Sequence, residues 1–397
     1  MSTGLLGEPV RHARLPAFWL ALLAGPMSFG IAGPALILDD AARDLGVPTG
    51  SATWVVTAFG WGIAVGTPLM SRLLGHRGTR AALAVCALFL VVGAALVVAV
   101  PALPMLVAGS AAQALGAAGM TGTAMNLADS PRRMGLATAS LAVVGSVAPL
   151  AGSLVADLLS WQVALALPAL AVLAVPAVAR SAPPRPAEPY PFDAAGAALL
   201  TTMVTALVFL PHQPLVAAAG ALVAGVPLAL WIRARPDGFV PAVLVRTPRF
   251  MLSCGLAFAL AVGNFALMYA LPVRLAPHWT AGQIGMAMVW PLLLGGTLSW
   301  FVVAASARVR PGLVIGALAV LGGAAPVAVA IGDWPPVLLV AQAAASIAAA
   351  SGQGVLAVRA TSSVSQAHRP AAIGLFNLAY LLGAAFGPAI VSLLLEV

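Results

Sequence analysis

The sequence predicts an all-helical protein embedded in a membrane, and three observations support this fold class. Of the 397 residues, 61% are hydrophobic and only 8% are charged, and the mean hydropathy is +1.03. A soluble domain carries roughly 25% charged residues, so lipid must solvate most of this chain. Apolar runs of about twenty residues, long enough to cross a bilayer as a helix, recur along it. The arginines between these runs are dense and sparse in alternation.

Thirteen such runs are predicted as membrane-spanning helices, in three groups. Their approximate ranges are 16–38, 52–71, 81–100, 104–127, 135–158, 161–179, 193–210, 214–232, 250–273, 282–305, 312–331, 335–358 and 371–395. The proline-rich segment from Ser181 to Pro191 is too stiff and polar to span, and is interpreted as a linker. We therefore divide the chain into an N-terminal half (1–180), a linker with two additional helices (181–249) and a C-terminal half of five helices (250–397).

The arginines support this count and predict an orientation. All nineteen basic residues are arginine, and with a cytoplasmic N-terminus seventeen of them fall on the cytoplasmic side. Only Arg43 and Arg274 fall outside, as the positive charge of cytoplasmic loops requires. The odd number of helices then places the C-terminus outside. We expect a multi-pass protein of the cell membrane.

Several other classes are excluded. The net charge of +8 does not indicate nucleic acid, because the arginines are scattered singly between apolar runs. Cys86 and Cys254 lie in apolar runs, so neither a disulfide framework nor a metal site is expected. The first apolar run lacks a cleavage site and is interpreted as a retained helix. The sequence has no phosphate-binding loop, nucleophile elbow or zinc pattern, so it predicts neither an enzyme nor a cofactor.

A helix face without large side chains is the first functional feature. Gly145, Pro149 and Gly152 recur at i, i+4 and i+7 in the fifth run, so they share one side of the helix. Small residues let helices approach closely in lipid, and Pro149 removes one backbone donor. The order of residues resembles the fifth-helix antiporter motif of the major facilitator superfamily, Gly-x-x-x-Gly-Pro-x-x-Gly-Gly. Ala148 and Ser153 stand at two of its glycine positions.

Polar segments between the first helices resemble further motifs of that superfamily. The loop from Ser71 to Arg80 is similar to its cytoplasmic signature, Gly-x-x-x-Asp-Arg-x-Gly-Arg-Arg. Gly75 replaces the aspartate and His76 the first arginine, so the charge network that the resemblance implies is weakened or built differently. Ser110 stands where the family's fourth helix has an arginine implicated in proton transfer. The turn from Asp129 to Arg133 after the fourth run resembles the family's acidic-proline-arginine turn. The residues assigned to the cytoplasmic gating region are Arg72, Arg77, Gly78, Arg80, Asp129 and Arg133.

Later landmarks resemble the fourteen-spanner drug/proton antiporter branch of the superfamily. Phe192 to Gly196 looks like the opening of that branch's additional helix pair, and Ser306 to Arg310 like a second copy of the signature. The run 371–395 matches the penultimate helix of the branch, so a final helix is expected to be absent. The resemblance implies two halves that rock about a central cavity.

Neutral polar residues in the apolar runs are the candidates for this cavity. An unpaired amide in lipid costs a few kcal/mol, so each of them either contacts the cavity or bonds to a neighbouring helix. Asn264 and Asn377 are preferred, because the resemblance implies that their helices line the cavity. The residues assigned to the substrate cavity are Gln113, Asn264, Asn377, Trp61, Met120, Tyr269 and Trp290.

Proton coupling needs a titratable group near the cavity. All eleven acidic residues, however, fall at helix ends, in linkers or at the termini. Asp39, Asp40 and Asp157, at the outer ends of the first and fifth helices, are the nearest candidates. Each either titrates at the mouth of the cavity or marks where its helix leaves the bilayer.

Two functions from different classes fit these features. The first is a transporter that exports small hydrophobic compounds by alternating access, as multidrug efflux proteins do, with or without proton coupling. The second is a transporter fold that no longer pumps and serves as a receptor, an assembly subunit or a membrane-embedded enzyme. Four departures from the family pattern favour the second. The first helix lacks the aspartate that the branch usually has there, Ser110 and Gly75 replace the fourth-helix arginine and the signature aspartate, and the final helix is missing. Expected partners are the lipid bilayer, a small hydrophobic substrate and, in a coupled transporter, protons.

Overall fold

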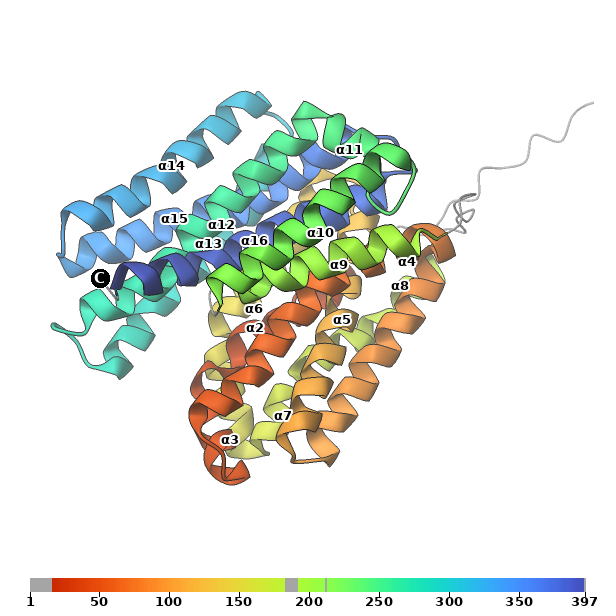
Figure 1. Cartoon of the computed structure of the whole chain (residues 1–397). Helices are drawn as coiled ribbons and strands as arrows, with labels where there is room; N and C mark the ends of the chain where they lie inside the picture. Colours follow the sequence, from red (N-terminus) through yellow and green to blue (C-terminus); the bar gives the residue numbers. More distant parts are fainter. Residues whose placement is uncertain (1–15, 183–191, 211–212, 396–397) are drawn as a thin grey trace, which may run out of the picture.

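The computed structural model describes residues 16–182, 192–210 and 213–395, and all regular elements in these ranges are helical (Figure 1). The elements are α1 (Ala17–Ala24), α2 (Met27–Ala32), η1 (Gly33–Leu36), α3 (Leu38–Leu45), α4 (Thr49–Ala99), α5 (Leu103–Leu127), α6 (Pro131–Leu158), α7 (Trp161–Leu165), η2 (Leu167–Ala174), α8 (Val175–Ser181), α9 (Ala194–Phe209), α10 (Pro214–Ala234), α11 (Ala242–Arg246), α12 (Pro248–Leu275), α13 (Ala281–Ala305), α14 (Pro311–Ile331), α15 (Pro335–Ser362) and α16 (Arg369–Leu395).

The predicted all-helical membrane fold is confirmed. Within the described ranges, nine helices are long and apolar enough to cross a membrane, and three shorter apolar helical stretches accompany them. Each of the thirteen predicted runs coincides with helix in the structure. The number of crossings and the side on which each terminus lies stay predictions.

Prolines divide two of the predicted spans into short pieces. The first span is formed by α1, α2 and η1, with Pro26 before α2 and Pro34 in the first turn of η1. The sixth is formed by α7, the 3-10 helix η2 and α8, with Pro168 and Pro176 in the first turns of the last two. Proline donates no backbone hydrogen bond and clashes with the preceding turn. The expectation of one continuous helix in each span is therefore wrong at these breaks.

The second and third predicted spans form a single element of 51 residues, α4, which turns sharply at Gly78. Gly78 has a φ of 76°, a left-handed conformation that glycine adopts without steric cost. The expected loop from Ser71 to Arg80 is therefore helical except at this turn.

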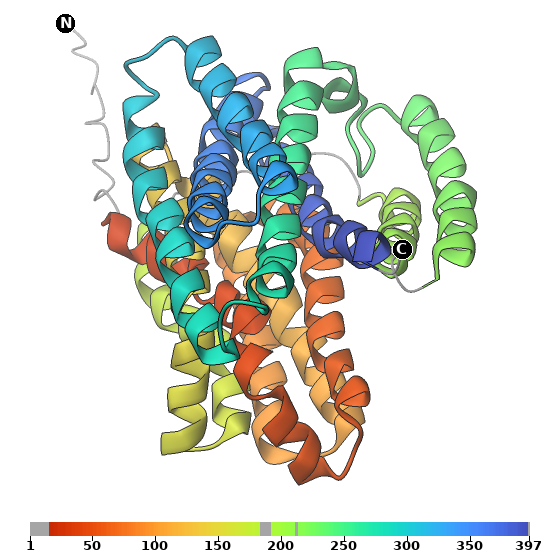
Figure 2. The ribbon, with the colours of Figure 1, turned by 90° about the vertical axis from the view of Figure 1, so that its left-hand side faces the viewer.

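The helices form two bundles. The N-terminal bundle contains α1 to α8, and the C-terminal bundle contains α12 to α16. They are joined by contact of α6 with α13 and of α4 with α16. Helix α9 packs against both α4 and α16, and α10 packs against α9. Figure 2 shows this additional pair at one side of the molecule.

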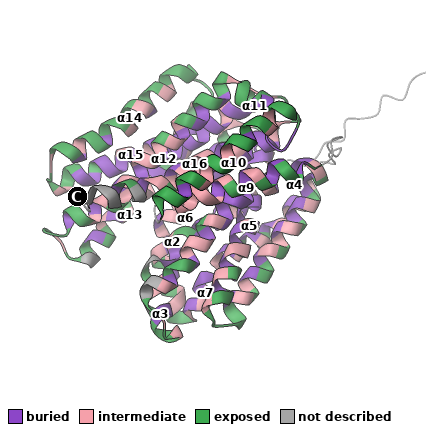
Figure 3. Cartoon of the chain, in the orientation of Figure 1, coloured by how far each residue is buried: buried purple, intermediate pink, exposed green. Residues whose placement is uncertain are grey.

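The bundles contact each other toward one end, which we call the arginine-rich end because it carries the Gly78 turn and the starts of α6 and α16. The other end of the molecule carries Arg43 and Arg274, and we call it the opposite end. In Figure 1 the two bundles converge near α11. The far end of the N-terminal bundle, at α3 and α7, points away from the C-terminal bundle. Figure 3 shows the outward faces of α10 and α14 largely exposed, as helices solvated by lipid would be.

Helix α6 is in contact with α13 at the arginine-rich end and more exposed toward the opposite end. A Cβ added at Gly135 would lie 2.9 Å from Val303 of α13, so the two helices touch there. Nearer the opposite end of α6, Leu150, Leu154 and Leu158 are 52%, 58% and 72% exposed.

Candidate functional site

The glycine face of α6 packs on the first predicted span. A Cβ added at Gly152 would come within 2.7 Å of the Gly33 carbonyl oxygen, so the two backbones are in direct contact. Gly145 lies near Ser28, to which an added Cβ would be 3.6 Å distant. Pro149 lies inside α6 between these contacts. This face of α6 joins two segments of the N-terminal bundle. Its role in antiport of substrate stays a prediction.

The arginines of the signature turn contact α8 and the additional helices. Arg72 is buried, and its Nη2 donates to the Gly238 carbonyl between α10 and α11 at 3.2 Å. Arg80 donates from Nε to the Ala179 carbonyl of α8 at 3.0 Å. Arg77 is exposed. The turn therefore ties the N-terminal bundle to the segment after α10.

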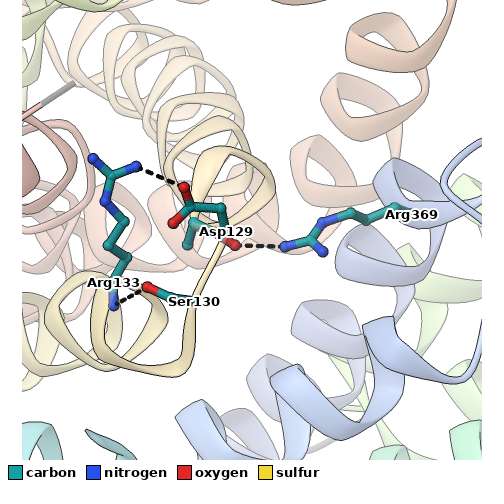
Figure 4. Close-up of polar contacts among 5 residues, drawn as sticks. Asp129, Ser130, Arg133 and Arg369 are labelled. Carbon is teal, nitrogen blue, oxygen red and sulfur yellow. Dashed lines mark hydrogen bonds and ion pairs between the residues drawn. The ribbon is translucent and has the colours of Figure 1, made fainter. Parts of the chain in front are cut away.

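A polar cluster at the arginine-rich end joins the two bundles (Figure 4). Arg369, at the start of α16, donates from Nη2 to the Ala128 carbonyl at the end of α5, at 2.6 Å. The predicted pair between Asp129 and Arg133 is present at 3.2 Å, and the Ser130 hydroxyl caps α6 by accepting from the Arg133 amide. That ion pair lies within one bundle and its carboxylate is exposed, so it contributes little. Arg369 provides the contact between bundles.

A second guanidinium joins the bundles where α6 meets α13. The Cζ atom of Arg132 lies 5.6 Å from the ring centre of Trp300, within the range of a cation–π interaction. Both bridging arginines, Arg132 and Arg369, thus have neutral acceptors. Sequence reasoning missed them because it treated both only as topological charges. One signal was available, since each adjoins a proline that starts a helix.

The predicted cavity residues of the N-terminal bundle are used in packing. Gln113 is fully buried and donates to the Leu165 carbonyl of α7 at 3.3 Å. Trp61 donates from Nε1 to the Thr205 hydroxyl of α9 at 3.0 Å. Met120 is fully buried in the largest apolar core. Gln113 and Trp61 therefore form hydrogen bonds between helices.

The two preferred asparagines lie in different settings. Asn264 accepts from Gln342 Nε2 of α15 at 3.0 Å, within the C-terminal bundle. Asn377 of α16 faces the other bundle, with Nδ2 3.0 Å from the Met125 sulfur of α5. The structure does not bring the seven assigned residues around one space, and their part in binding stays a prediction.

Accessible aromatic and aliphatic side chains lie in the parts of the bundles nearer the opposite end. Tyr269 on α12 and Trp290 on α13 are both exposed. Leu150 and Leu154 add exposed apolar surface on the part of α6 nearer the opposite end. Sequence reasoning missed these leucines, because a leucine within an apolar run carries no positional signal.

The proton-coupling candidates lie at the opposite end. Asp40 is exposed and forms an ion pair with Arg43, and Asp157 is exposed. The side chain of Asp39 lies outside the described residues. A shallow pocket of about 580 Å³ is lined there by Asp40, Arg43, Asp44, Ser160, Trp161 and Gln162. Exposed carboxylates at this end are compatible with titration at the mouth of the cavity and with marking where a helix leaves the bilayer. A role in proton coupling therefore stays a prediction.

Asp193, which sequence reasoning placed only at the start of the additional pair, is the single buried acid among the described residues. Just before α9, its carboxylate accepts from the amides of Gly196 at 3.0 Å and Phe239 at 2.8 Å and from the Trp231 indole at 3.0 Å. Burial acts to raise the pKa of Asp193, but these hydrogen bonds and nearby Arg235 outweigh it and hold the pKa below its ordinary value. The carboxylate therefore anchors the additional pair in its charged form.

Two helical bundles that meet at one end and part at the other, with apolar outer faces, define a multi-pass membrane protein of transporter architecture. The chain belongs to the Major Facilitator Superfamily, whose family model matches residues 18–245. The matched range contains the N-terminal bundle from α1 onward and the additional pair. Membership in the drug/proton antiporter branch stays a prediction.

Solved transporter structures show that the fold extends over the whole chain. The human organic anion transporter MFSD10 (TETRAN) superposes with a TM-score of 0.66 at 17% identity, over 96% of this chain and 93% of its own. The POT family transporter PepTSo gives 0.56 at 16% identity, over 98% and 90%. The proton:xylose symporter XylE gives 0.56 at 14% identity, over 96% and 89%. At these identities the likeness shows the fold alone. A comparison with curated protein sequences gave no match.

Proposed function

We propose that this protein exports small hydrophobic compounds, neutral or weakly charged, by alternating access between its two bundles. The observation that carries the proposal is the scarcity of buried charge. Among the described residues, only Arg72 and Asp193 are both charged and buried. Both bond to the segment around Gly238, at the arginine-rich end. A charged substrate would need a countercharge inside the protein, because burying an unpaired ion is costly.

The side chains uncovered where the bundles part support an apolar substrate. Leu150, Leu154, Tyr269 and Trp290 offer aliphatic and aromatic surface, the usual lining of a site for hydrophobic molecules. MFSD10 is described as an organic anion transporter. We do not extend that substrate class to this chain, because its one buried arginine within the described ranges, Arg72, is bonded to Gly238.

The direction and energy source of transport belong to the same proposal. Resemblance of the Gly145 to Gly152 face to the antiporter motif supports efflux, and we place the protein in the cell membrane. If protons drive it, the candidate carriers are Asp39, Asp40 and Asp157 at the opposite end.

Counterflow in proteoliposomes of the full chain tests the substrate class without assuming an energy source. Liposomes loaded with an uncharged hydrophobic antibiotic should accumulate labelled antibiotic, whereas tetraphenylphosphonium and a benzoate-type anion should show no counterflow. Leu150→Trp should slow the exchange at least fivefold by filling space between the bundles. Leu222→Trp on the exposed face of α10 is the matched control and should leave the rate unchanged.

Three outcomes would redirect the proposal. Counterflow of the ions without the neutral compound would contradict the substrate class. Saturable binding without counterflow would favour a receptor or assembly role. Proton release from energised everted vesicles on addition of antibiotic would establish coupling, and Asp40→Asn and Asp157→Asn should then identify the carrier.

A further inference from the structure

Four arginines lie between residues 233 and 249, around the connection from α10 to α12. Arg233, Arg235, Arg246 and Arg249 are exposed, and none forms an ion pair or side-chain hydrogen bond with a described residue. Asp237 is the only acid in this stretch. Arg72, Arg80, Arg133 and Arg369 bond to the protein itself, whereas Arg77, Arg308 and Arg310 are exposed like these four. The four therefore leave their guanidinium donors available.

The backbone that carries these arginines is held in place. The amide of Phe239 donates to Asp193 at 2.8 Å, and the Gly238 carbonyl accepts from Arg72 at 3.2 Å. Phe239 and Leu244 are buried in apolar contacts. Arg235 lies over the ring of Trp231, with its Cζ 5.3 Å from the ring centre. A fixed backbone presents the charges together, which reduces the entropy lost when a ligand binds them.

The position of the segment selects the kind of partner. It joins α10 to α12, two helices that are long and apolar enough to cross a membrane (Figure 1). It therefore lies where helices leave the bilayer. Val243 and Val245 on α11 are exposed beside the arginines, as are Met251 and Leu252 at the start of α12. Apolar side chains next to cationic ones are typical of protein surfaces that enter the headgroup region.

We infer that residues 233–249, here called the arginine segment, bind the headgroups of anionic phospholipids. Guanidinium groups pair with phosphate oxygens in a bidentate manner. Each arginine near an anionic membrane surface strengthens binding by roughly fivefold. The inference concerns a surface outside the transport pathway and does not depend on the proposed substrate.

Native mass spectrometry of the full chain in detergent tests this surface with two lipids of equal chain length. Dioleoyl phosphatidylglycerol should bind at least tenfold more tightly than dioleoyl phosphatidylcholine. The double variant Arg246→Gln, Arg249→Gln should lose roughly 25-fold in affinity for phosphatidylglycerol. The matched control is Arg308→Gln, Arg310→Gln, which removes two exposed arginines from the connection between α13 and α14 and should change the affinity less than twofold.

Each contrary result would overturn the inference. Equal binding of the two lipids would remove the role of charge, and equal loss in both double variants would show a general effect of net charge. Inorganic phosphate that abolishes the preference, at a conductivity matched with chloride, would show a site for free phosphate. The pair Arg233→Gln, Arg235→Gln repeats the test on the α10 side, and unchanged thermal unfolding of every variant establishes that the fold is retained.

Discussion

The two ends of the contact between the bundles are held in different ways. At the arginine-rich end, Arg369 bonds to Ala128, Arg132 covers Trp300, and Asn377 meets Met125. At the opposite end, no hydrogen bond between described residues passes from one bundle to the other, and Leu150, Leu154 and Leu158 of α6 are exposed.

The contacts that Arg369 and Arg132 make with Ala128 and Trp300, across the two bundles, involve neutral groups. The acceptors that the two bridging arginines use are a carbonyl oxygen and an aromatic face, and neither changes charge near neutral pH. Closure at the arginine-rich end therefore depends on packing and on individual hydrogen bonds. Alternating access requires these contacts to break while new ones form at the opposite end.

The largest effect is expected from Gly374→Leu on α16. A Cβ there would lie 2.7 Å from Ser71 of α4, so a leucine prevents close contact of the bundles. Overpacking costs about 1–3 kcal/mol, which shifts a two-state population by roughly fivefold to 150-fold. Spin labels at Leu158→Cys and Met286→Cys should move closer as the opposite end closes. The native cysteines are buried and should not react.

Gly316→Leu is the control for this variant, because no atom lies within 4 Å of an added Cβ there. It should leave the label distances unchanged. Identical distances in the Gly374 and Gly316 variants would contradict closure by packing at Ser71.

An intermediate effect is expected from Arg369→Gln. The substitution removes a charge-assisted hydrogen bond to Ala128, worth about 1–2 kcal/mol at a half-buried site. The same label pair should show a larger population with the opposite end closed. Arg310→Gln, at an exposed position, should have no such effect. A wild-type distance distribution in the Arg369 variant would assign closure to packing alone.

The smallest effect is expected from Asp129→Asn. Its ion pair with Arg133 stays within one bundle, and the carboxylate is largely exposed. Such pairs contribute less than about 1 kcal/mol. The label distances and the thermal unfolding temperature should both remain near wild type. A shift as large as that of Arg369→Gln would show that Asp129 takes part in closure after all.

The fold was within reach of the sequence because it depends on patterns that lipid imposes. Apolar length placed helix in every predicted run, and the glycine spacing of α6 placed its small face. The division at Pro26 and Pro168 was not foreseen, because a proline inside a span either ends, bends or barely disturbs a helix depending on its neighbours.

The candidate site was harder to predict, because side-chain partners are set by tertiary packing. Arg72, Arg233 and Arg369 have the same topological pattern, yet they respectively bond to the α10–α11 connection, remain exposed, and bridge the bundles. Gln113 and Asn377 are both amides in apolar runs, and only Asn377 reaches the other bundle.

The packing of α9 between α4 and α16 has a consequence for the speed of the conformational change. Trp61 bonds to Thr205, which fixes α9 to α4 in one register. Toward α16, the contacts of α9 include apolar side chains such as Leu378 and Leu382. Apolar surfaces slide between neighbouring positions without breaking directional bonds. We expect the additional pair to travel with the N-terminal bundle while α16 slides along it, so that shear against α9 helps to set the rate of each transport cycle.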